Sequence, residues 1–343
     1  MEAEDQLIDR ITKAVPSAAG GARLQGRLGP VVKMGIGDDA AIIVPRGASE
    51  WILTCDAFLE GVHFLRQLHP ADSVGYKALA RATSDIAAMG GLPRAFLLTL
   101  ALPDALDGHW LDQFFAGMKR AARALGVQLV GGDTTKSPRV FISITVLGEA
   151  PRGRAVLRSG AHPGDVIYAS GRLGRAQLGL ELLRRGFAKS ARRDRALRAA
   201  LNQHLYPQIR VELGAWLVRR RIVSAMLDLS DGLSTDLPRL CRASGAGARI
   251  DSRRIPCAEI PARAAGKLRG LRLDPLQLAL DGGEDYELLF TVPKPNAAKL
   301  RGAPGYPQLA AIGEITREQK VLLVDSAGRA RPLPSRGWDP FRK

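Results

Sequence analysis

The sequence predicts an α/β (α+β) protein made of two domains. Its 343 residues exceed the length of one typical domain, and 46% hydrophobic with 24% charged residues is typical of a folded chain. Short apolar stretches that are typical of strands alternate with segments of helical periodicity. A segment rich in Gly, Pro and Arg at 150–165 is the expected boundary, so the predicted domains are residues 1–150 and 151–343.

The first domain is predicted to combine helices with short strands. In the helix at 72–89, the apolar residues Val74, Ala78 and Ile86 recur at helical spacing. Gly90 follows the last of them and ends the helix. The other predicted elements are helices at 5–14 and 111–125, strands at 40–44, 51–55, 96–101, 127–130 and 140–147, and a loop at 131–135.

The second domain is predicted to follow the same mixture. Its helix after residue 232 should begin near 234 or 235, because Pro238 is tolerated only close to a helix start. Leu237, Leu240 and Cys241 of this helix form an apolar side that we expect in the core. The other predicted elements are strands at 166–169, 225–229, 287–292 and 321–324, and helices at 176–185, across the arginine-rich stretch 192–198, and at 211–219.

The net charge of +16 comes mostly from arginine, clustered at 184–185, 192–198, 219–221 and 253–254. Nucleic-acid-binding proteins combine such clusters with aromatic residues or a recognisable module. Here only 5% of the residues are aromatic and no such module is recognisable. Solvated helix faces are therefore favoured over a nucleic-acid surface.

Cysteine usage and hydropathy indicate a cytoplasmic protein without a membrane partner. Cys55, Cys241 and Cys257 are too scattered for a disulfide framework or a CxxC metal site. No apolar run approaches the ~20 residues that span a bilayer. The acidic first residues also lack the features of a signal peptide.

Carboxylates gather at the ends of the predicted strands although the chain is strongly basic. Close acids repel one another unless cations neutralise them, and oxygen ligands without nearby His or Cys pairs select Mg²⁺. Asp85 joins them from the C-terminal end of its predicted helix, where the helix dipole disfavours a carboxylate. A shared site for Mg²⁺ and phosphate is favoured, and the other acids concerned are Asp38, Asp39, Asp56, Asp133, Asp228 and Asp231.

Several of these residues also have an ordinary structural interpretation. Asp231 is suited to be the N-cap of the helix that follows it. Residues 281–285 (DGGED) fit either an acidic loop of the site or a hairpin-type turn. His63 lies close to the acidic stretch 54–56 and is suited to an anionic substrate, although an isolated histidine is more often structural.

Taken in order, the motifs resemble those of the thiamine-monophosphate kinase family, in the superfamily of aminoimidazole ribonucleotide synthetase. The resemblance runs from about residue 35 to 313, with a further match at 337–339. Its specificity comes from the order and spacing of the motifs. They are GIGDD (35–39), TCD (54–56), EGVH (60–63), SDIAAMG (84–90), GGDTT (131–135), RSG (158–160), PGD (163–165), DLSDGL (228–233), GGEDYE (282–287) and GWD (337–339).

The resemblance implies a two-domain aminoimidazole ribonucleotide synthetase-like fold and a homodimer that pairs through its N-terminal domains. It implies ATP-dependent phosphorylation of thiamine monophosphate to thiamine diphosphate, with each active site near the interface between domains. Residues 1–150 would then bind ATP and Mg²⁺ and form the dimer. Residues 151–343 would complete the nucleotide and substrate site.

Individual roles follow from the same resemblance. Gly132, Asp133, Arg158 and Ser230 match nucleotide-binding positions, whereas His63, Glu284 and Trp338 match substrate-binding positions. The metal-site positions are Asp39, Thr54, Cys55, Asp56, Asp85, Asp133, Asp228 and Asp231, for several Mg²⁺ ions.

Two positions depart from the family pattern. Cys55 stands where the family usually has Thr, and a neutral thiol is a poor Mg²⁺ ligand, so a metal contact there should come from the backbone carbonyl or water. Tyr206, in the HLYP stretch at 204–207, stands where the family usually has Arg, which concerns only a local contact.

The implied reaction fits the residue types. The acceptor phosphate has a second pKa of about 6 and is already ionised, so no general base and no catalytic side chain of that kind is expected. Direct in-line, Mg²⁺-assisted transfer from ATP is the simplest mechanism. The alternatives are another ATP-using enzyme of the superfamily and a basic nucleic-acid-binding protein that retains the fold.

Overall fold

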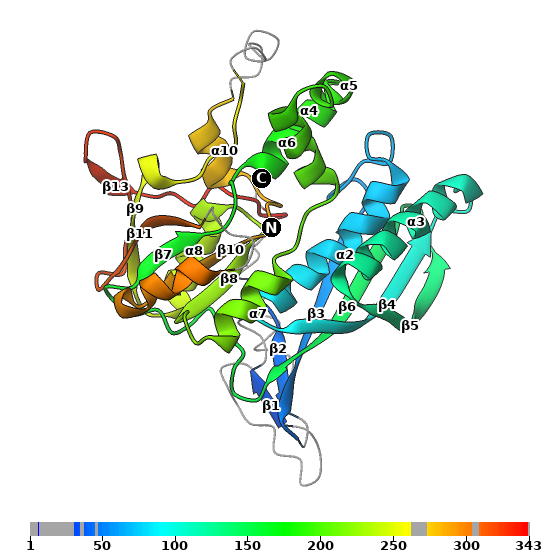
Figure 1. Ribbon diagram of the computed structural model, residues 1–343. Helices are drawn as coiled ribbons and strands as arrows, with labels where there is room; N and C mark the ends of the chain where they lie inside the picture. Colours follow the sequence, from blue (N-terminus) through cyan, green and yellow to red (C-terminus); the bar gives the residue numbers. More distant parts are fainter. Residues whose placement is uncertain are drawn as a thin grey trace. The chain divides into compact units, whose positions relative to one another are not determined.

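The computed structural model describes residue 6 and residues 31–34, 38–44, 47–261, 273–303 and 309–341. The chain forms two compact units: unit 1 is Met1–Ala155 with Asp339–Lys343, and unit 2 is Val156–Trp338. Each unit has its own sheet and its own helices (Figure 1), which confirms the expected α/β class. The predicted helix at 5–14 lies outside the described residues except for residue 6. In the described part of the chain, no helix is long and apolar enough to cross a membrane.

Unit 1 contains a sheet whose six described strands have the order β1-β2-β3-β6-β4-β5. All neighbours pair antiparallel except β4 and β5, which are parallel. Helix α2 packs against the sheet and α3 packs beside α2 (Figure 1). The elements are β1 (Val31–Met34), β2 (Ala41–Val44), β3 (Ser49–Leu59), α2 (Ala71–Ala88), β4 (Leu92–Leu102), α3 (Gly108–Leu125), β5 (Gln128–Lys136) and β6 (Phe141–Pro151).

The long strands of unit 1 follow from their apolar alternation. Strand β6 has every second residue buried, as expected when one face of a sheet is covered. Strand β3 pairs with β6 along its whole length, so the side-chain directions of β3 are set by this ladder. The observed strand β3 is therefore longer than the strand predicted at 51–55.

The loop predicted at 131–135 is wrong, because these residues lie inside strand β5. Their glycines and threonines pair in parallel with β4, from Leu97 opposite Gly131 to Ala101 opposite Thr135. Glycine-rich composition suggested a loop, whereas the close approach of the two backbones requires glycine in the strand. A Cβ on Gly132 would lie 1.9 Å from the carbonyl oxygen of Leu98.

Unit 2 contains a sheet whose seven described strands have the order β13-β12-β9-β11-β7-β10-β8. Only the β12–β9 pair is parallel among them. The elements are β7 (Val166–Ala169), α4 (Arg175–Arg184), α5 (Ala188–Ala191), α6 (Arg195–Leu205), α7 (Val211–Arg219), β8 (Ala225–Leu229), α8 (Leu233–Ala243), β9 (Gly247–Asp251), the 3₁₀ helix η2 (Ser252–Arg254), α10 (Pro275–Asp281), β10 (Glu287–Val292), the 3₁₀ helix η3 (Lys294–Gly302), β11 (Ala310–Thr316), β12 (Val321–Val324) and β13 (Ala330–Pro332).

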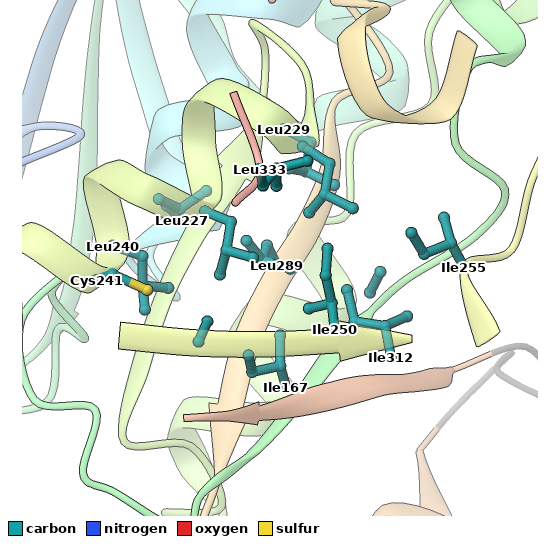
Figure 2. Close-up of a cluster of buried hydrophobic side chains, with 14 of the residues drawn as sticks. Ile167, Leu227, Leu229, Leu240, Cys241, Ile250, Ile255, Leu289, Ile312 and Leu333 are labelled. Atoms are coloured by element: carbon teal, nitrogen blue, oxygen red, sulfur yellow. The ribbon is translucent and has the colours of Figure 1, made fainter. Parts of the chain in front are cut away.

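The core of unit 2 lies between this sheet and helix α8. Figure 2 shows Leu240 and Cys241 of α8 near Leu227 of β8, with Ile250 and Ile312 from β9 and β11 nearby. All of these side chains are buried. The expectation that Cys241 belongs to the core is confirmed, and burial raises the pKa of its thiol to about 12.

Helix α8 begins at Leu233, one residue before the predicted start. Pro238 is its sixth residue, so the missing backbone N–H falls just after the first turn. Residues 281–285 are not a hairpin turn, because they connect helix α10 to strand β10. This connection carries residues of the candidate site in unit 2.

Candidate functional site

In unit 1, strand β3 and helix α2 bring polar partners together in matched pairs. Thr54 and Asp56 lie two residues apart on β3 and therefore share one face of the strand. The Thr54 hydroxyl donates to Asp85 Oδ2 at 2.5 Å. Arg81 Nε lies 2.7 Å from Asp56 Oδ2. Because Arg81 and Asp85 are four residues apart on α2, they lie on the same face of the helix.

Asp39 joins Asp85 from the segment that precedes β2. Carboxylate oxygens of the two residues lie within 4.8 Å of each other. Asp39 is buried, and its backbone N–H donates to Asp38 Oδ1 at 2.9 Å. Two carboxylates held this close favour a cation between them, and their hard oxygen atoms suit Mg²⁺. These two acids therefore fit a magnesium ion by distance and donor type.

Cys55 lies on the other face of β3 from Thr54. Its side chain is exposed, and its Sγ lies 3.4 Å from the hydroxyl oxygen of Ser143 on β6. The alternation of β3 accounts for this placement, since adjacent strand residues point to opposite faces. The structure therefore brings Thr54 to Asp85 and does not bring the thiol of Cys55 there.

His63 and Asp133 have local partners. His63 Nδ1 accepts a hydrogen bond from the backbone N–H of Leu59 at 3.0 Å, which holds the ring in the turn after β3. Asp133 lies on the exposed strand β5, next to Gly132, and its Oδ1 accepts from the Thr134 N–H at 2.9 Å. The expectation that Asp56 and Asp133 lie at strand ends is wrong, because both lie inside longer strands than the sequence predicted.

In unit 2, the segment from Asp228 to Asp231 leaves strand β8 and enters helix α8. Asp228 is buried at the end of β8. The N-cap of α8 is Gly232, without a side-chain cap hydrogen bond, so the N-cap interpretation of Asp231 is wrong. The Asp231 carboxylate instead pairs with Arg239, in the second turn of the helix.

Asp236 completes this group from the buried side of α8. Arg239 Nη1 lies 3.1 Å from Asp236 Oδ1, and the Asp231 N–H donates to Asp236 Oδ2 at 3.0 Å. Burial, reinforced by the Asp231 carboxylate, holds the pKa of Asp236 well above its usual range, although Arg239 acts in the opposite direction. Arg239 thus keeps Asp231 oriented beside a crowded set of acids.

The loop before β10 lies directly against the Asp228–Asp231 segment. The Glu284 N–H donates to the Ser230 carbonyl at 2.7 Å, and the Tyr286 N–H donates to the Leu229 carbonyl at 2.9 Å. A Cβ on Gly283 would lie 2.7 Å from the Ser230 carbonyl oxygen, so this approach requires glycine. The GGEDYE and DLSDGL motifs, far apart in sequence, are therefore neighbours.

The C-terminal GWD motif joins the same place. The Trp338 N–H donates to the Asp231 carbonyl at 2.9 Å, and the Gly337 N–H donates to the Thr235 hydroxyl at 3.1 Å. A Cβ on Gly337 would lie 2.0 Å from the Asp231 carbonyl oxygen. Trp338 itself remains 47% exposed, as a ring available for stacking would be.

Arg158 is placed by its backbone. Its carbonyl accepts from the Ser244 hydroxyl at 3.0 Å, just after α8, and the preceding Leu157 carbonyl accepts from the Met226 N–H at 3.1 Å. Hydrogen bonds to Met226 of β8 and to Ser244 therefore hold the segment that carries Arg158.

Sequence reasoning missed Arg81 and Arg239. Each neutralises a predicted metal-site carboxylate, Asp56 and Asp231 respectively. The signal was available for Arg81, because its spacing of four residues from Asp85 places it on the helix face that carries the acids. For Arg239, the three-residue spacing from Asp236 was such a signal, but Asp236 was not among the predicted site residues.

Comparison with known families covers both units. Residues 37–150 match AIR synthase related protein, N-terminal domain, and residues 162–325 match AIR synthase related protein, C-terminal domain.

Individual relatives agree with this match. The chain is 37% identical to thiamine-monophosphate kinase of Escherichia coli K12, over 90% of this chain and 92% of that protein. It is also 37% identical to thiamine-monophosphate kinase of Aquifex aeolicus, over 89% of this chain and 92% of the relative. A solved structure of AaThiL complexed with AMPPCP and TMP is similar with a TM-score of 0.80 and 32% identity, covering 99% of this chain and 97% of that one.

Proposed function

Because the chain belongs to the AIR synthase related family, we propose that it transfers the γ-phosphoryl group of ATP to thiamine monophosphate and forms thiamine diphosphate. The observation that carries this proposal is the likeness to thiamine-monophosphate kinases, which extends over nine tenths of the chain and through both domains. The complex of the similar AaThiL with AMPPCP and TMP supports the same pair of reactants.

The acceptor needs no general base. A phosphate monoester has a second pKa of about 6, so its oxygen is already a nucleophile at neutral pH. The main obstacle is the repulsion between two polyanions, and the protein must position and neutralise them. We therefore propose direct in-line transfer, with no phosphorylated side chain as intermediate.

The carboxylates would hold the Mg²⁺ ions that accompany ATP. Asp39 and Asp85 support this role by their separation, and Thr54 orients Asp85 through its hydroxyl. The further proposed ligands are Asp56, Asp133, Asp228 and Asp231, with Cys55 limited to a backbone or water-mediated contact. When bound, Mg²⁺ would supply positive charge to the phosphate oxygens.

Other side chains would bind the organic parts and the remaining phosphate charge. We propose that Gly132, Asp133, Arg158 and Ser230 contact the nucleotide, with Arg158 stabilising charge on the phosphates. His63 would meet the phosphate of thiamine monophosphate. Glu284 and Trp338 would contact the thiamine moiety, Glu284 through its carboxylate and Trp338 through its ring face.

We also propose that residues 1–150 form a homodimer contact and bind ATP with Mg²⁺, while residues 151–343 complete the nucleotide and substrate site. Strand β5 supports the dimer contact, because it is an edge strand of the unit 1 sheet and is exposed along its whole length. Its Leu129 and Val130 are 55% and 64% exposed, which a second copy would cover. The three free cysteines fit a reducing cytoplasm as the proposed compartment.

A coupled ADP-release assay tests the proposed function. The purified protein with Mg²⁺ and ATP is given thiamine monophosphate, thiamine or an aminoimidazole ribonucleotide precursor in parallel reactions. We expect ADP release that depends on thiamine monophosphate and is lost on removal of Mg²⁺ by chelation. ADP release with thiamine but not with its monophosphate would overturn the proposed substrate.

A further inference from the structure

The loop that carries Glu284 has a strained backbone. Glu284 and Tyr286 have φ angles of +67° and +50°, a region that residues other than glycine rarely adopt. Such a conformation is unfavourable and persists only where surrounding contacts enforce it. The hydrogen bonds from both backbone N–H groups, to Leu229 at the end of β8 and to Ser230 just after it, supply part of that constraint.

Helix α6 supplies further contacts to this loop from its last turn. Gln203 Nε2 donates to the Asp285 carbonyl at 2.6 Å. The next residue, His204, places its Nδ1 3.4 Å from Oε2 of Glu284. The His204 side chain is 1% exposed, whereas the Glu284 side chain is 24% exposed, so the histidine supports the carboxylate from the buried side.

The neighbouring residues hold the loop without His204. Both carboxylate oxygens of Asp285 accept from the start of α4, from the Gly174 N–H at 2.5 Å and the Ala176 N–H at 3.0 Å. Glu287 is buried and forms a two-point ion pair with Arg210, at 2.7 and 2.5 Å. His204 contacts the one carboxylate of this loop that is turned toward solvent.

We propose that His204 is a positioning residue that fixes the Glu284 carboxylate for the thiamine moiety, an inference that rests on the proposed function. A free glutamate side chain loses conformational entropy when it is ordered. A carboxylate already held beside the imidazole of His204 avoids most of this loss when the ligand binds. His204 therefore acts on recognition of thiamine monophosphate and not on ATP or on the transfer itself.

The test compares His204→Gln with His204→Asn in steady-state kinetics. The Asn amide nitrogen falls near the position of Nδ1, whereas the Gln amide reaches toward the position of Nε2. We expect H204Q to raise the KM for thiamine monophosphate by about fivefold to tenfold, the range expected when one side chain must be ordered on binding. The kcat and the KM for ATP should change by less than about twofold, and H204N should restore most of the substrate affinity.

Two controls separate positioning from a structural effect. His109→Gln makes the same change at an exposed histidine of α3 and should leave all constants unchanged. In a Glu284→Gln background, adding H204Q should have no further effect on the KM for thiamine monophosphate, because both residues act through one carboxylate. Thermal unfolding of each variant confirms folding, and His204→Phe replaces H204Q if the latter does not fold.

The outcomes are distinguishable. Three results would overturn the role of His204 but not the proposed function. They are an unchanged KM for thiamine monophosphate in H204Q, an equal rise in the KM for ATP, and additivity of H204Q with E284Q. Absence of thiamine monophosphate-dependent ADP release by the wild-type protein would overturn the proposed function and this role with it.

Discussion

At the scale of single residues, unit 1 arranges its carboxylates by two simple periodicities. A strand repeats its direction every two residues and a helix every 3.6, so Thr54 and Asp56 of β3 face Asp85 and Arg81 of α2. The positive charge of Arg81 offsets Asp56, while Asp39 lies within reach of Asp85. Asp85 therefore lies close to a second carboxylate, that of Asp39, and accepts a hydrogen bond from the Thr54 hydroxyl, which orients it.

The charge of Asp85 should be essential. Asp85→Asn keeps an acceptor for the Thr54 hydroxyl but removes the negative charge, so kcat/KM should fall by at least about 100-fold. Steady-state ADP release at saturating and limiting Mg²⁺ measures this effect. Asp104→Asn, at an exposed acid paired with Lys136, is the matched control. Wild-type rates for D85N at both Mg²⁺ concentrations would refute the metal role.

The thiol of Cys55 should be dispensable. Because its side chain points away from Thr54 and Asp85, Cys55→Thr should leave both the turnover rate and the Mg²⁺ dependence unchanged. The same titration of ADP release against Mg²⁺ measures it. A shifted Mg²⁺ requirement in C55T would show that this side chain does act at the metal.

At the scale of elements, the sequence predicted the apolar parts well and the glycine-rich parts poorly. Strands β7, β8, β10 and β12 have the predicted bounds, because continuous apolar runs identify buried strands. Residues 131–135 were misplaced because glycine favours loops unless a neighbouring backbone approaches closely, and that approach depends on a partner strand remote in sequence. For the same reason, the contact between Glu284 and His204 could not be predicted from spacing.

Replacing Gly132 in the β4–β5 pair should destabilise the fold. In Gly132→Ala, the new Cβ would lie 1.9 Å from the Leu98 carbonyl oxygen, so the two backbones must move apart. We expect a loss of unfolding free energy of roughly 1–3 kcal/mol, as for other overpacked sites. Urea unfolding measures it. Gly108→Ala at the start of α3, where nothing lies within 4 Å, should be nearly neutral, and equal losses in both variants would contradict the steric explanation.

The loop before β10 should also confer a pH dependence on stability. Burial raises the pKa of Asp285 from 3.8 to about 7, although the hydrogen bonds from Ala176 and Gly174 act in the opposite direction. Glu287, which raises this pKa further, and Arg175, which lowers it, are the other charged groups that act on it. The folded protein therefore keeps a proton that the unfolded chain releases between pH 4 and 7. The contribution of Asp285 to stability is complete below pH 4 and is lost as the pH rises through 7.

Asp285→Asn removes this titration. Because the amide stays neutral, D285N should gain stability relative to the wild-type protein between pH 5 and pH 8. Urea unfolding of both proteins at the two pH values measures the change, with Asp104→Asn as an exposed control whose difference from wild type should not depend on pH. A constant difference between D285N and wild type would show that Asp285 is ionised throughout.

At the scale of the whole molecule, the order of the motifs was more informative than any single one. Each acidic motif alone had an ordinary structural interpretation. For Asp231 that interpretation was a helix N-cap, and the structure excludes it because Gly232 is the N-cap. Within unit 2, backbone hydrogen bonds make DLSDGL a neighbour of GGEDYE and of Trp338. The sequence predicted these motifs but not the partner His204, because a contact between residues far apart in sequence leaves no periodic signal.

The most direct measurement identifies the product. The protein is incubated with Mg²⁺, ATP and thiamine monophosphate, and the thiamine phosphates are oxidised to fluorescent thiochromes and separated by chromatography while ADP is quantified. Formation of one thiamine diphosphate for each ADP, without free inorganic phosphate, is the predicted result. ADP accumulation with inorganic phosphate and unchanged thiamine monophosphate would contradict phosphoryl transfer to this acceptor.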